Sequence, residues 1–171
     1  MIYTIGHSTH TAEAFVGLLR AHGVAQIADV RTVPKSRRHP HFNGPALDTI
    51  LRDHGVTYRH FPALGGFRTP RPDSRNTAWT HPAFRGYADY METDAFRVAL
   101  APLLAFASDA STAVMCAESV WWRCHRRLLA DALVVGGATV RHILSLAEPK
   151  PHELTEFARV EEGRVTYPGL L

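Results

Sequence analysis

The sequence contains two cysteines, and one of them stands in a run of residues suited to activating a thiol. Cys124 lies between Arg123 and the pair His125 and Arg126, and we expect this run in the first turn of a helix over residues 123–135. A helix N-terminus and neighbouring cations favour the thiolate, which lowers a cysteine pKa from its free value of about 8.5. Cys124 is therefore a candidate nucleophile or redox thiol. The equally weighted alternative is a cysteine that packs into the core.

A second pair of reactive side chains, Cys116 and Glu118, stands at the end of an expected strand over residues 112–117. Residues two apart share a face of a strand, so both side chains should point the same way. A carboxylate at the end of a buried strand is costly unless it is paired. We therefore expect Glu118 to act chemically, with an ion pair to Arg126 as the alternative. Cys116 alone is more typical of a small core residue.

Asp29 and Arg31 stand at the end of another expected strand, residues 25–30, with the same spacing of two. On one strand face they would form an ion pair that directs the guanidinium toward a carboxylate or phosphate, which arginine binds bidentately. The alternative is a structural pair that braces the loop that follows. That loop, residues 33–41, adds Arg37 and other cations, which could contact an anion or simply be solvated.

His7 and Ser8 follow the first expected strand, residues 2–6. Hydroxyls and backbone N–H groups before a helix can hold a phosphate or carboxylate, so both residues are candidates for a ligand site. Ser8 and Thr9 are also good helix caps, and capping is the favoured interpretation for them. Capping needs no imidazole, so His7 stays evenly balanced between a chemical and a structural role.

No familiar metal or nucleotide motif accounts for these residues. Cys116, Cys124 and His125 could bind a metal together with His7, but the eight-residue spacing of the cysteines matches no common zinc pattern. We therefore predict no metal ligand, and the residues identify no cofactor. The chain also lacks the glycine-rich dinucleotide and P-loop signatures. Cys116 and Arg123 are one residue too far apart for the CX5R loop of cysteine phosphatases.

Short β-type runs alternate with helix-length amphipathic segments, a pattern typical of a mainly parallel sheet covered by helices. We predict a three-layer α/β fold with a five-stranded, mainly parallel sheet flanked by helices, and a C-terminal tail resembling a β-hairpin on an edge of the domain. Ligands bind such sheets beyond the carboxyl ends of the strands, which is where these reactive side chains are expected. The expected strands span residues 2–6, 25–30, 56–61, 112–117 and 139–144, the helices begin near residues 11, 45, 82, 94 and 123, and the hairpin spans residues 157–160 and 164–167.

The composition limits the classes of protein to which the chain can belong. Its 171 residues suit one domain, residues 1–171, and 46% hydrophobic with 20% charged residues is typical of globular proteins. No apolar run is long enough to span a bilayer, and the first residues read as a strand rather than a signal peptide. We therefore expect a cytoplasmic protein without membrane contact, whose cysteines are free thiols. The oligomeric state stays open.

The net charge of +3 suits an anionic partner, either a small molecule or nucleic acid, but the arginines are scattered along the chain. Two arginine-rich stretches, residues 33–41 and 66–75, could contact a nucleic-acid backbone. The second lies within residues 62–81, a stretch without evident secondary structure that is typical of a functional or mobile loop. Trp121 and Trp122 could stack on bases, although covering the core under a loop is the favoured interpretation.

Several ordered motifs along the chain carry a family resemblance. They are Ile2-Tyr3-Thr4-Ile5-Gly6-His7-Ser8-Thr9, Asp29-Val30-Arg31 with Pro34, Ser36-Arg37 and Phe42, Leu64-Gly65-Gly66, Cys116-Ala117-Glu118 and Cys124-His125-Arg126. With these motifs the chain, from residue 2 to at least residue 143, resembles the family catalogued as domain of unknown function 488. The resemblance implies a compact α/β fold with these positions in one site, and it implies no particular reaction. The chain departs from the usual pattern at residues 120–122, where polar residues or proline are more common, so no substrate contact is implied there.

The leading hypothesis from the sequence is an enzyme that acts on an anionic substrate, phosphorylated or nucleotide-like, at the strand ends. Arginines would hold the anion, a glutamate or histidine would transfer protons, and a cysteine would supply the thiol. The residues in these roles are Arg31, Arg37 and Arg126 for the anion, Glu118 or His7 for protons, and Cys124 or Cys116 for the thiol, with Ser8, Asp29 and His125 at the substrate. The alternatives are a nucleic-acid-binding module that uses the arginine-rich loops and a metal-binding protein.

Overall fold

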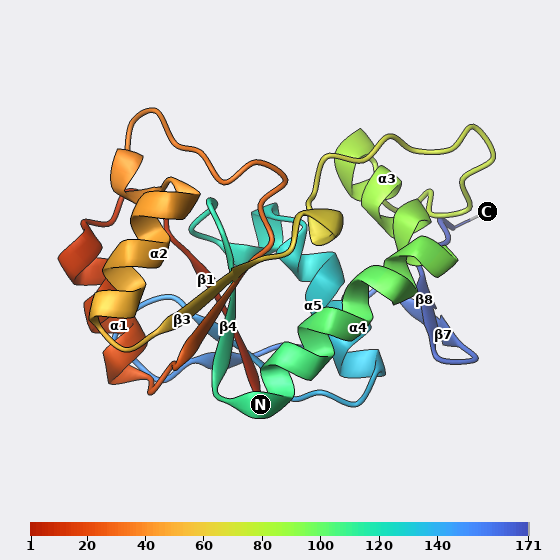
Figure 1. The fold of residues 1–171 in the computed structure, drawn as a ribbon. Coiled ribbons are helices and arrows are strands. Elements are labelled where there is room, and N and C mark those ends of the chain that lie inside the picture. The colour runs from red at the N-terminus through yellow and green to blue at the C-terminus, as the bar shows by residue number, and fades with distance from the viewer. Residues whose placement is uncertain (171) are drawn as a thin grey trace.

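Five short parallel strands form the centre of the computed structural model, which describes residues 1–170 (Figure 1). They are β1 (Ile2–Gly6), β2 (Gln26–Asp29), β3 (Thr57–His60), β4 (Thr112–Cys116) and β5 (Val140–Ile143). A sixth strand, β6 (Lys150–Pro151), pairs antiparallel with β5, and the order across the sheet is β3-β2-β4-β1-β5-β6. The predicted mainly parallel α/β fold is confirmed. The sequence did not indicate β6 because two residues are too few to show an alternating pattern.

Helices cover both faces of the sheet, so the fold has three layers. α1 (Ala12–Ala21) and α2 (Gly44–Asp53) pack on one face; α3 (Pro82–Met91), α4 (Asp94–Asp109) and α5 (Arg126–Val135) pack on the other (Figure 1). The central strands β1, β2 and β4 are largely buried toward both layers, as parallel sheets require, whereas the edge strand β3 is polar and partly exposed. Ile27 and Met115 face α1 and α2, while their neighbours Ala28 and Val114 face the other three helices.

The carboxyl end of β4 lies where the direction of the connections reverses. The chain leaves β1 and β2 toward the helices α1 and α2 on one face, whereas it leaves β4, which lies between them, toward α5 on the other face. Strand ends that diverge in this way open a crevice. Gly6 permits the close approach of the two loops there, because a Cβ at this position would overlap the backbone carbonyl of Glu118.

The segment before α5 differs from the prediction. The helix expected from residue 123 begins at Arg126, and a short 3-10 helix, η3 (Trp121–Arg123), precedes it. Cys124 lies between the two in extended backbone conformation. Trp121 stacks on the buried ring of His142 with the ring centres 4.0 Å apart, which confirms the core-covering interpretation for this tryptophan, while Trp122 is 44% exposed.

The N-terminal cap of α1 is the residue at which the helix was expected to begin, whereas the capping interpretation favoured for Ser8 and Thr9 is wrong. Thr11, and neither Ser8 nor Thr9, is the cap, because its hydroxyl accepts a hydrogen bond from the Ala14 N–H at 3.1 Å. Ser8 instead has a positive φ of 46°, a backbone conformation that residues other than glycine seldom adopt. The turn directs the chain away from β1 before α1 begins, so Ser8 is left at the strand exit.

The C-terminal tail forms the expected hairpin. Strands β7 (Arg159–Glu161) and β8 (Arg164–Thr166) make a separate two-stranded sheet. It packs on α3 and α5 (Figure 1). Val165 and Tyr167 are buried there in the same core as α5. The tail therefore stabilises the helical layer on which the β4 exit depends.

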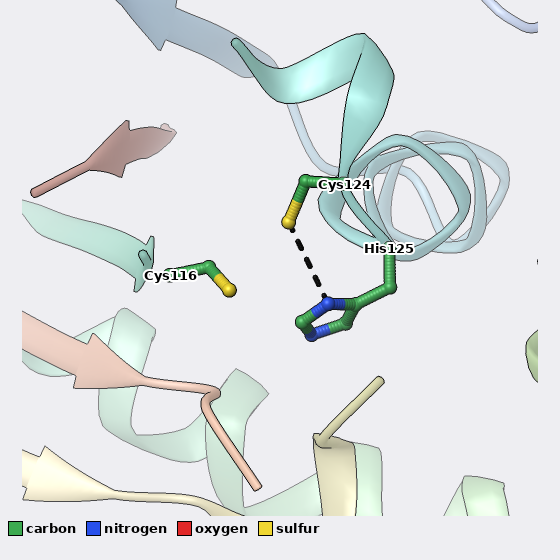
Figure 2. Close-up of side chains that lie close together, drawn as sticks. All are labelled: Cys116, Cys124 and His125. Atoms are coloured by element: carbon green, nitrogen blue, oxygen red, sulfur yellow. Dashed lines mark hydrogen bonds between the residues drawn. The ribbon is translucent and has the colours of Figure 1, made fainter. Parts of the chain in front are cut away.

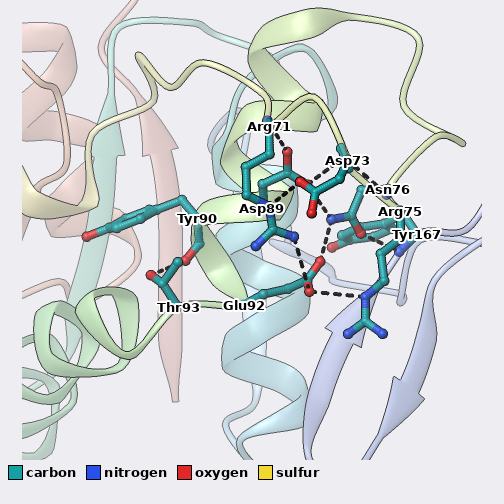
Figure 3. Close-up of polar contacts among 10 residues, drawn as sticks. Arg71, Asp73, Arg75, Asn76, Asp89, Tyr90, Glu92, Thr93 and Tyr167 are labelled. Atoms are coloured by element: carbon teal, nitrogen blue, oxygen red, sulfur yellow. Dashed lines mark hydrogen bonds and ion pairs between the residues drawn. The ribbon is translucent and has the colours of Figure 1, made fainter.

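Residues 62–81 are irregular apart from the 3-10 helix η2 (Pro62–Leu64), yet polar contacts fix them to α3 and to the tail (Figure 3). The buried Asn76 amide donates to Asp89 at 2.8 Å and to Glu92 at 2.6 Å, and its oxygen accepts from the Tyr167 N–H at 2.8 Å. The loop is thus an anchored connection. A further 3-10 helix, η1 (Pro40–Phe42), precedes α2. None of the helices in residues 1–170 is long and apolar enough to cross a membrane.

Candidate functional site

A cavity of about 860 Å³ lies at the carboxyl ends of β1, β2 and β4, within the usual range for ligand pockets. The structure brings most of the predicted site residues to its wall. Those that line it are His7, Ser8, Arg31, Arg37, Cys116, Glu118, Cys124 and His125. Asp29 and Arg126 are buried behind the wall and do not line it.

Cys124 and His125 form a hydrogen-bonded pair on this wall (Figure 2). The Cys124 sulfur lies 3.5 Å from Nδ1 of His125, and Nε2 of the same ring lies 3.2 Å from the backbone oxygen of Val30. A carbonyl only accepts, so Nε2 carries a proton and donates to it. In the neutral ring Nδ1 is then left to take the proton of the Cys124 thiol. A nucleophile, a base and a group that orients the base are the parts of an activated thiol.

Cys116 faces this pair from the last residue of β4 (Figure 2). Ligand atoms of Cys116, Cys124 and His125 all lie within 4.8 Å of one another. A hydrogen bond from the Cys116 thiol, together with His125 and the nearby Arg126 guanidinium, holds the pKa of Cys124 well below its ordinary value. The Arg126 N–H, at the start of α5, also donates to the Cys124 sulfur at 3.5 Å. The same hydrogen bond, together with burial, raises the pKa of Cys116.

The position of the His125 ring depends on Gly66, the last residue of the Leu64-Gly65-Gly66 motif. A Cβ at Gly66 would lie 2.6 Å from His125 Nδ1, closer than any real contact. The ring also packs against buried Tyr87, with the ring centres 5.1 Å apart. The Leu64-Gly65-Gly66 motif was the signal for this contact, but its partner, far along the chain, was not evident from spacing.

Asp29 and Arg31 form the buried ion pair that their spacing predicts. Nε and Nη2 of Arg31 donate to the two carboxylate oxygens of Asp29 at 2.9 and 2.6 Å, and Tyr58 adds a donated hydrogen bond at 2.7 Å. The fork of the guanidinium is therefore occupied by Asp29. Nη1 remains on the cavity side, where it lies 3.3 Å from Nε2 of His7.

His7 is placed to orient Arg31. Its Nδ1 lies 3.0 Å from the Ser8 carbonyl and so donates a proton, which leaves Nε2 to accept from Arg31. The ring is stacked on Phe42 with the ring centres 4.2 Å apart. Burial, reinforced by the Arg31 charge, lowers the pKa of His7 to about 4. A ring that is neutral at pH 7 with both nitrogens engaged is suited to positioning and poorly suited to moving protons.

Two predicted residues stand differently from expectation. Glu118 was expected to be buried at the end of a strand, but β4 ends at Cys116 and the Glu118 side chain is exposed at the cavity rim. Arg126 makes no ion pair with that carboxylate. Its buried guanidinium donates to the backbone oxygens of Glu118 and Ser119 and so holds the loop after β4. Arg126 does not line the cavity, so the role that its contacts support is to fix this loop.

The wall of the cavity combines cations with apolar side chains. Glu118 is the one carboxylate among the described residues that line it. The cations beyond Arg31 are Lys35, Arg37, Arg38 and Arg123, and the apolar wall includes Val33, Phe67, Ala83 and Phe84. Phe67 is 83% exposed at the mouth. This composition suits a ligand that carries both an anionic group and an apolar part.

The second arginine-rich stretch is engaged within the molecule. Arg68 lies 3.7 Å from the centre of the Tyr90 ring and donates to the Ala63 carbonyl at 2.7 Å. Arg71 and Arg75 both pair with Glu92, at 3.6 and 3.1 Å (Figure 3). These contacts compete with a phosphate backbone for the same guanidinium groups. The cations of residues 33–41 that line the cavity have no such ion pairs within residues 1–170.

The cysteines and His125 are also side chains of the types that bind zinc, and three such ligands with an open position are known in catalytic zinc sites. The hydrogen bond from His125 Nε2 to a backbone carbonyl is typical of metal-binding histidines. His7, the fourth member of the set considered from the sequence, is engaged with Ser8 and Arg31 instead. Within the described residues the cluster therefore offers three ligands from one side.

Comparisons with known proteins identify the family. The comparisons with curated proteins and with solved structures found no match. The family model described as domain of unknown function DUF488 matches residues 11–133, which include Asp29, Arg31 and the whole Cys116–Arg126 segment. The match covers well over half of the chain. The chain therefore belongs to the DUF488 family, a domain family of unknown function.

Proposed function

We propose that this protein is a thiol-dependent enzyme that acts on an anionic substrate, with Cys124 as the nucleophile and His125 as its base. The observation that carries the proposal is the Cys124–His125 hydrogen bond of 3.5 Å inside a cavity whose rim carries four further cations. Structural cysteines are usually inert and surrounded by apolar groups, whereas reactive ones lie beside cations and helix N-termini.

The geometry supports covalent catalysis of group transfer. The Cys124 thiolate would attack an electrophilic carbon or phosphorus of the substrate, forming a bond to sulfur as the leaving group departs. The thiol proton, held on Nδ1 of His125, would pass to the leaving group, and the ring would then deprotonate the water that releases the enzyme. The hydrogen bond to Val30 keeps Nδ1 aimed at sulfur throughout.

The charged residues would bind the substrate. Arg31, fixed by Asp29 and His7, lines the cavity with its remaining N–H groups, and Arg37 is an exposed residue of the same wall. Both would bind the anionic group, and Ser8 would add a hydroxyl at the β1 exit. The apolar wall with Phe67 and Phe84 would accommodate the rest of a nucleotide-like or other bulky substrate.

A zinc-binding protein is the second candidate, because three ligand atoms lie within 4.8 Å. It predicts stoichiometric zinc in protein purified without an affinity tag, and thiols that react only after a chelator removes the metal. The thiol enzyme predicts that Cys124 of the same preparation reacts at once, with no effect of the chelator.

The test uses two electrophiles of similar size, negatively charged iodoacetate and neutral iodoacetamide. The cavity charge should increase the rate of Cys124 with iodoacetate, relative to iodoacetamide, above the ratio for free cysteine, and salt should reduce the excess. The double substitution Arg37→Gln with Arg38→Gln should remove most of it. Lys150→Gln, which removes an exposed cation that does not line the cavity, is the control and should change nothing. A ratio equal to that of free cysteine would contradict an anion-binding site.

A further inference from the structure

We infer that Cys116 is the resolving partner of Cys124, so that oxidation by a hydroperoxide converts the pair into a reversible disulfide across the cavity floor. The inference deepens the proposed function and rests on its reactive Cys124. The inference is based on the positions of the two cysteines, whose sulfur atoms lie within 4.8 Å of each other and which both line the same cavity.

The two thiols come from different parts of the fold. Cys116 is the last residue of β4 and Cys124 precedes α5, with η3 between them. A disulfide needs the sulfur atoms about 2.05 Å apart, so closure requires an approach of at most roughly 3 Å. Cys124 has extended backbone and lies outside both helices, so its side chain can turn toward Cys116 without unwinding either helix.

The surroundings make the thiols unequal, as a peroxide-reactive pair requires. Cys124 is contacted by His125 and by the Arg126 N–H, whereas Cys116 donates its hydrogen bond to Cys124. A thiolate attacks peroxide and a neutral thiol beside it condenses with the product. The cavity admits a small hydroperoxide to both sulfur atoms, because both belong to its wall.

The chemistry proceeds in two balanced steps. The Cys124 thiolate attacks the terminal oxygen of the hydroperoxide, the O–O bond breaks, and the alkoxide or hydroxide leaves with the proton held on His125. Sulfur is oxidised by two electrons to sulfenic acid as the peroxide is reduced to an alcohol or water. The Cys116 sulfur then attacks the Cys124 sulfur, the S–O bond breaks, and the departing hydroxide takes the Cys116 proton as water.

This pair of cysteines would protect the enzyme from irreversible oxidation of Cys124. A sulfenic acid without a neighbouring thiol proceeds to sulfinic and sulfonic acids, which ordinary thiols cannot reduce. With Cys116 adjacent, oxidation would stop at the disulfide, and a dithiol would restore both the nucleophile and its base. The activity of the site would then follow the balance of hydroperoxide and thiol around it.

The experiment treats the purified protein with a small excess of hydrogen peroxide and follows the intact mass and the peptides. The chain has only two cysteines, so an intramolecular disulfide can join only Cys116 to Cys124. We expect wild type to lose the mass of two hydrogens and to regain it with dithiothreitol. Cys116→Ser should instead gain two or three oxygens on Cys124, and Cys124→Ser should resist the same dose. Circular dichroism checks the fold of both variants, and the wild-type result stands without them.

The outcomes separate the two proposals. Oxidation of wild-type Cys124 to sulfinic acid with no disulfide, as in Cys116→Ser, would overturn the resolving role and leave the reactive Cys124 in place. Disulfide formation in wild type combined with rapid peroxide consumption by Cys124→Ser would show Cys116 as the attacking thiol, which overturns both the assignment of roles and the proposed nucleophile. A disulfide only between two chains, seen on non-reducing gels, would also overturn the inference.

Discussion

At the scale of single residues, the site depends on side chains that have only one arrangement available. His125 is held by the Val30 carbonyl on one side and packs against the Tyr87 ring on another. On a third side Gly66 lies so close to the ring that no side chain would fit between them. Such confinement keeps Nδ1 beside the Cys124 sulfur. Preorganisation of this kind is what makes a base effective.

Gly66→Ala tests this confinement. Its Cβ would lie 2.6 Å from Nδ1, so the His125 ring must move and its hydrogen bond to Cys124 weakens. A charge-assisted hydrogen bond contributes about 1.5 kcal/mol, so we expect iodoacetamide to modify Cys124 about tenfold more slowly at pH 7. The control is Gly17→Ala in α1, where a Cβ meets nothing within 4 Å. That change should leave the rate unaltered and stabilise the protein by roughly 0.5–1 kcal/mol.

Asp29→Asn tests whether the carboxylate is what holds Arg31. The asparagine removes the charge that pairs the guanidinium and places an amide NH2 among donors from Arg31 and Tyr58. Removing one partner of a buried ion pair costs about 3–5 kcal/mol, which urea unfolding would measure. Asp48→Asn, at an exposed pair with Arg52, should cost less than about 1 kcal/mol. If Asp29→Asn and Asp48→Asn reduced the free energy of unfolding equally, burial would add nothing to the strength of the Asp29–Arg31 ion pair.

At the scale of elements, the exit of β4 is supported by the C-terminal tail through α5. Asp131 on α5 accepts a hydrogen bond from the Tyr167 hydroxyl at 2.7 Å and from His152 at 2.7 Å, and His152 contacts His142 on β5 at 2.9 Å. Trp121 of η3 lies flat on that His142 ring. The buried polar chain thus connects the tail to the segment that carries Cys124.

Tyr167→Phe measures the strength of this connection. Both the hydroxyl and Asp131 are fully buried, so the variant leaves one carboxylate oxygen without its donor. A lost hydrogen bond to a buried group costs about 1–3 kcal/mol, and we expect this decrease in the free energy of unfolding. Tyr3→Phe is the control, because the Tyr3 hydroxyl makes no hydrogen bond within residues 1–170, and its change should stay near zero. A Tyr167 variant as stable as the control would contradict a supporting role for the tail.

The sequence predicted elements well where the pattern is local. Apolar runs and helix periods located all five main strands and the five helices, and the period of two placed Asp29 with Arg31 correctly. It failed at Glu118 because β4 ends at Cys116, and a strand end decides whether a side chain is buried. The start of α5 was misplaced because the Trp121–Arg123 turn has helical composition but closes as a 3-10 helix.

Contacts between distant segments could not be predicted. The His125 ring meets the Val30 carbonyl 95 positions away, and no residue type marks a backbone oxygen as a partner. Arg126 was expected to hold the substrate anion, with an ion pair to Glu118 as the alternative, but its guanidinium instead donates to backbone carbonyls of the loop after β4. The convergence of the strand exits was predictable from the sheet order typical of such folds. Which side chains then touch each other depends on packing.

At the scale of the whole molecule, buried neutral histidines link the stability of the fold to pH. Burial, together with the charge of Arg31, lowers the pKa of His7 to about 4. Burial, together with the charge of His152, lowers the pKa of His142 to about 3. Both values lie below the unfolded value of about 6.5. The unfolded chain therefore binds more protons in this range. The stability from these two groups is complete above about pH 6.5 and decreases as the pH falls toward 4 and 3.

The expected result is an unfolding midpoint in urea that decreases steadily between pH 6.5 and pH 4. Histidine resonances of His7 and His142, assigned through the substitutions His7→Gln and His142→Gln, should not titrate between pH 8 and pH 5. Either variant should make the decrease in stability shallower, since it removes one group that takes up a proton on unfolding. A stability that is constant over this range, or rings that titrate near 6.5, would contradict the buried neutral state.

The central claim is that the fold makes Cys124 a reactive thiolate, and the pH dependence of its alkylation tests this most directly. Wild-type protein is treated with iodoacetamide from pH 4 to pH 10, and peptide mass spectrometry follows Cys116 and Cys124 separately. We predict that Cys124 reacts first at every pH and that the midpoint of its reactivity lies well below the value of about 8.5 for a free thiol. Preferential reaction of Cys116, or a Cys124 midpoint at or above that value, would contradict the account.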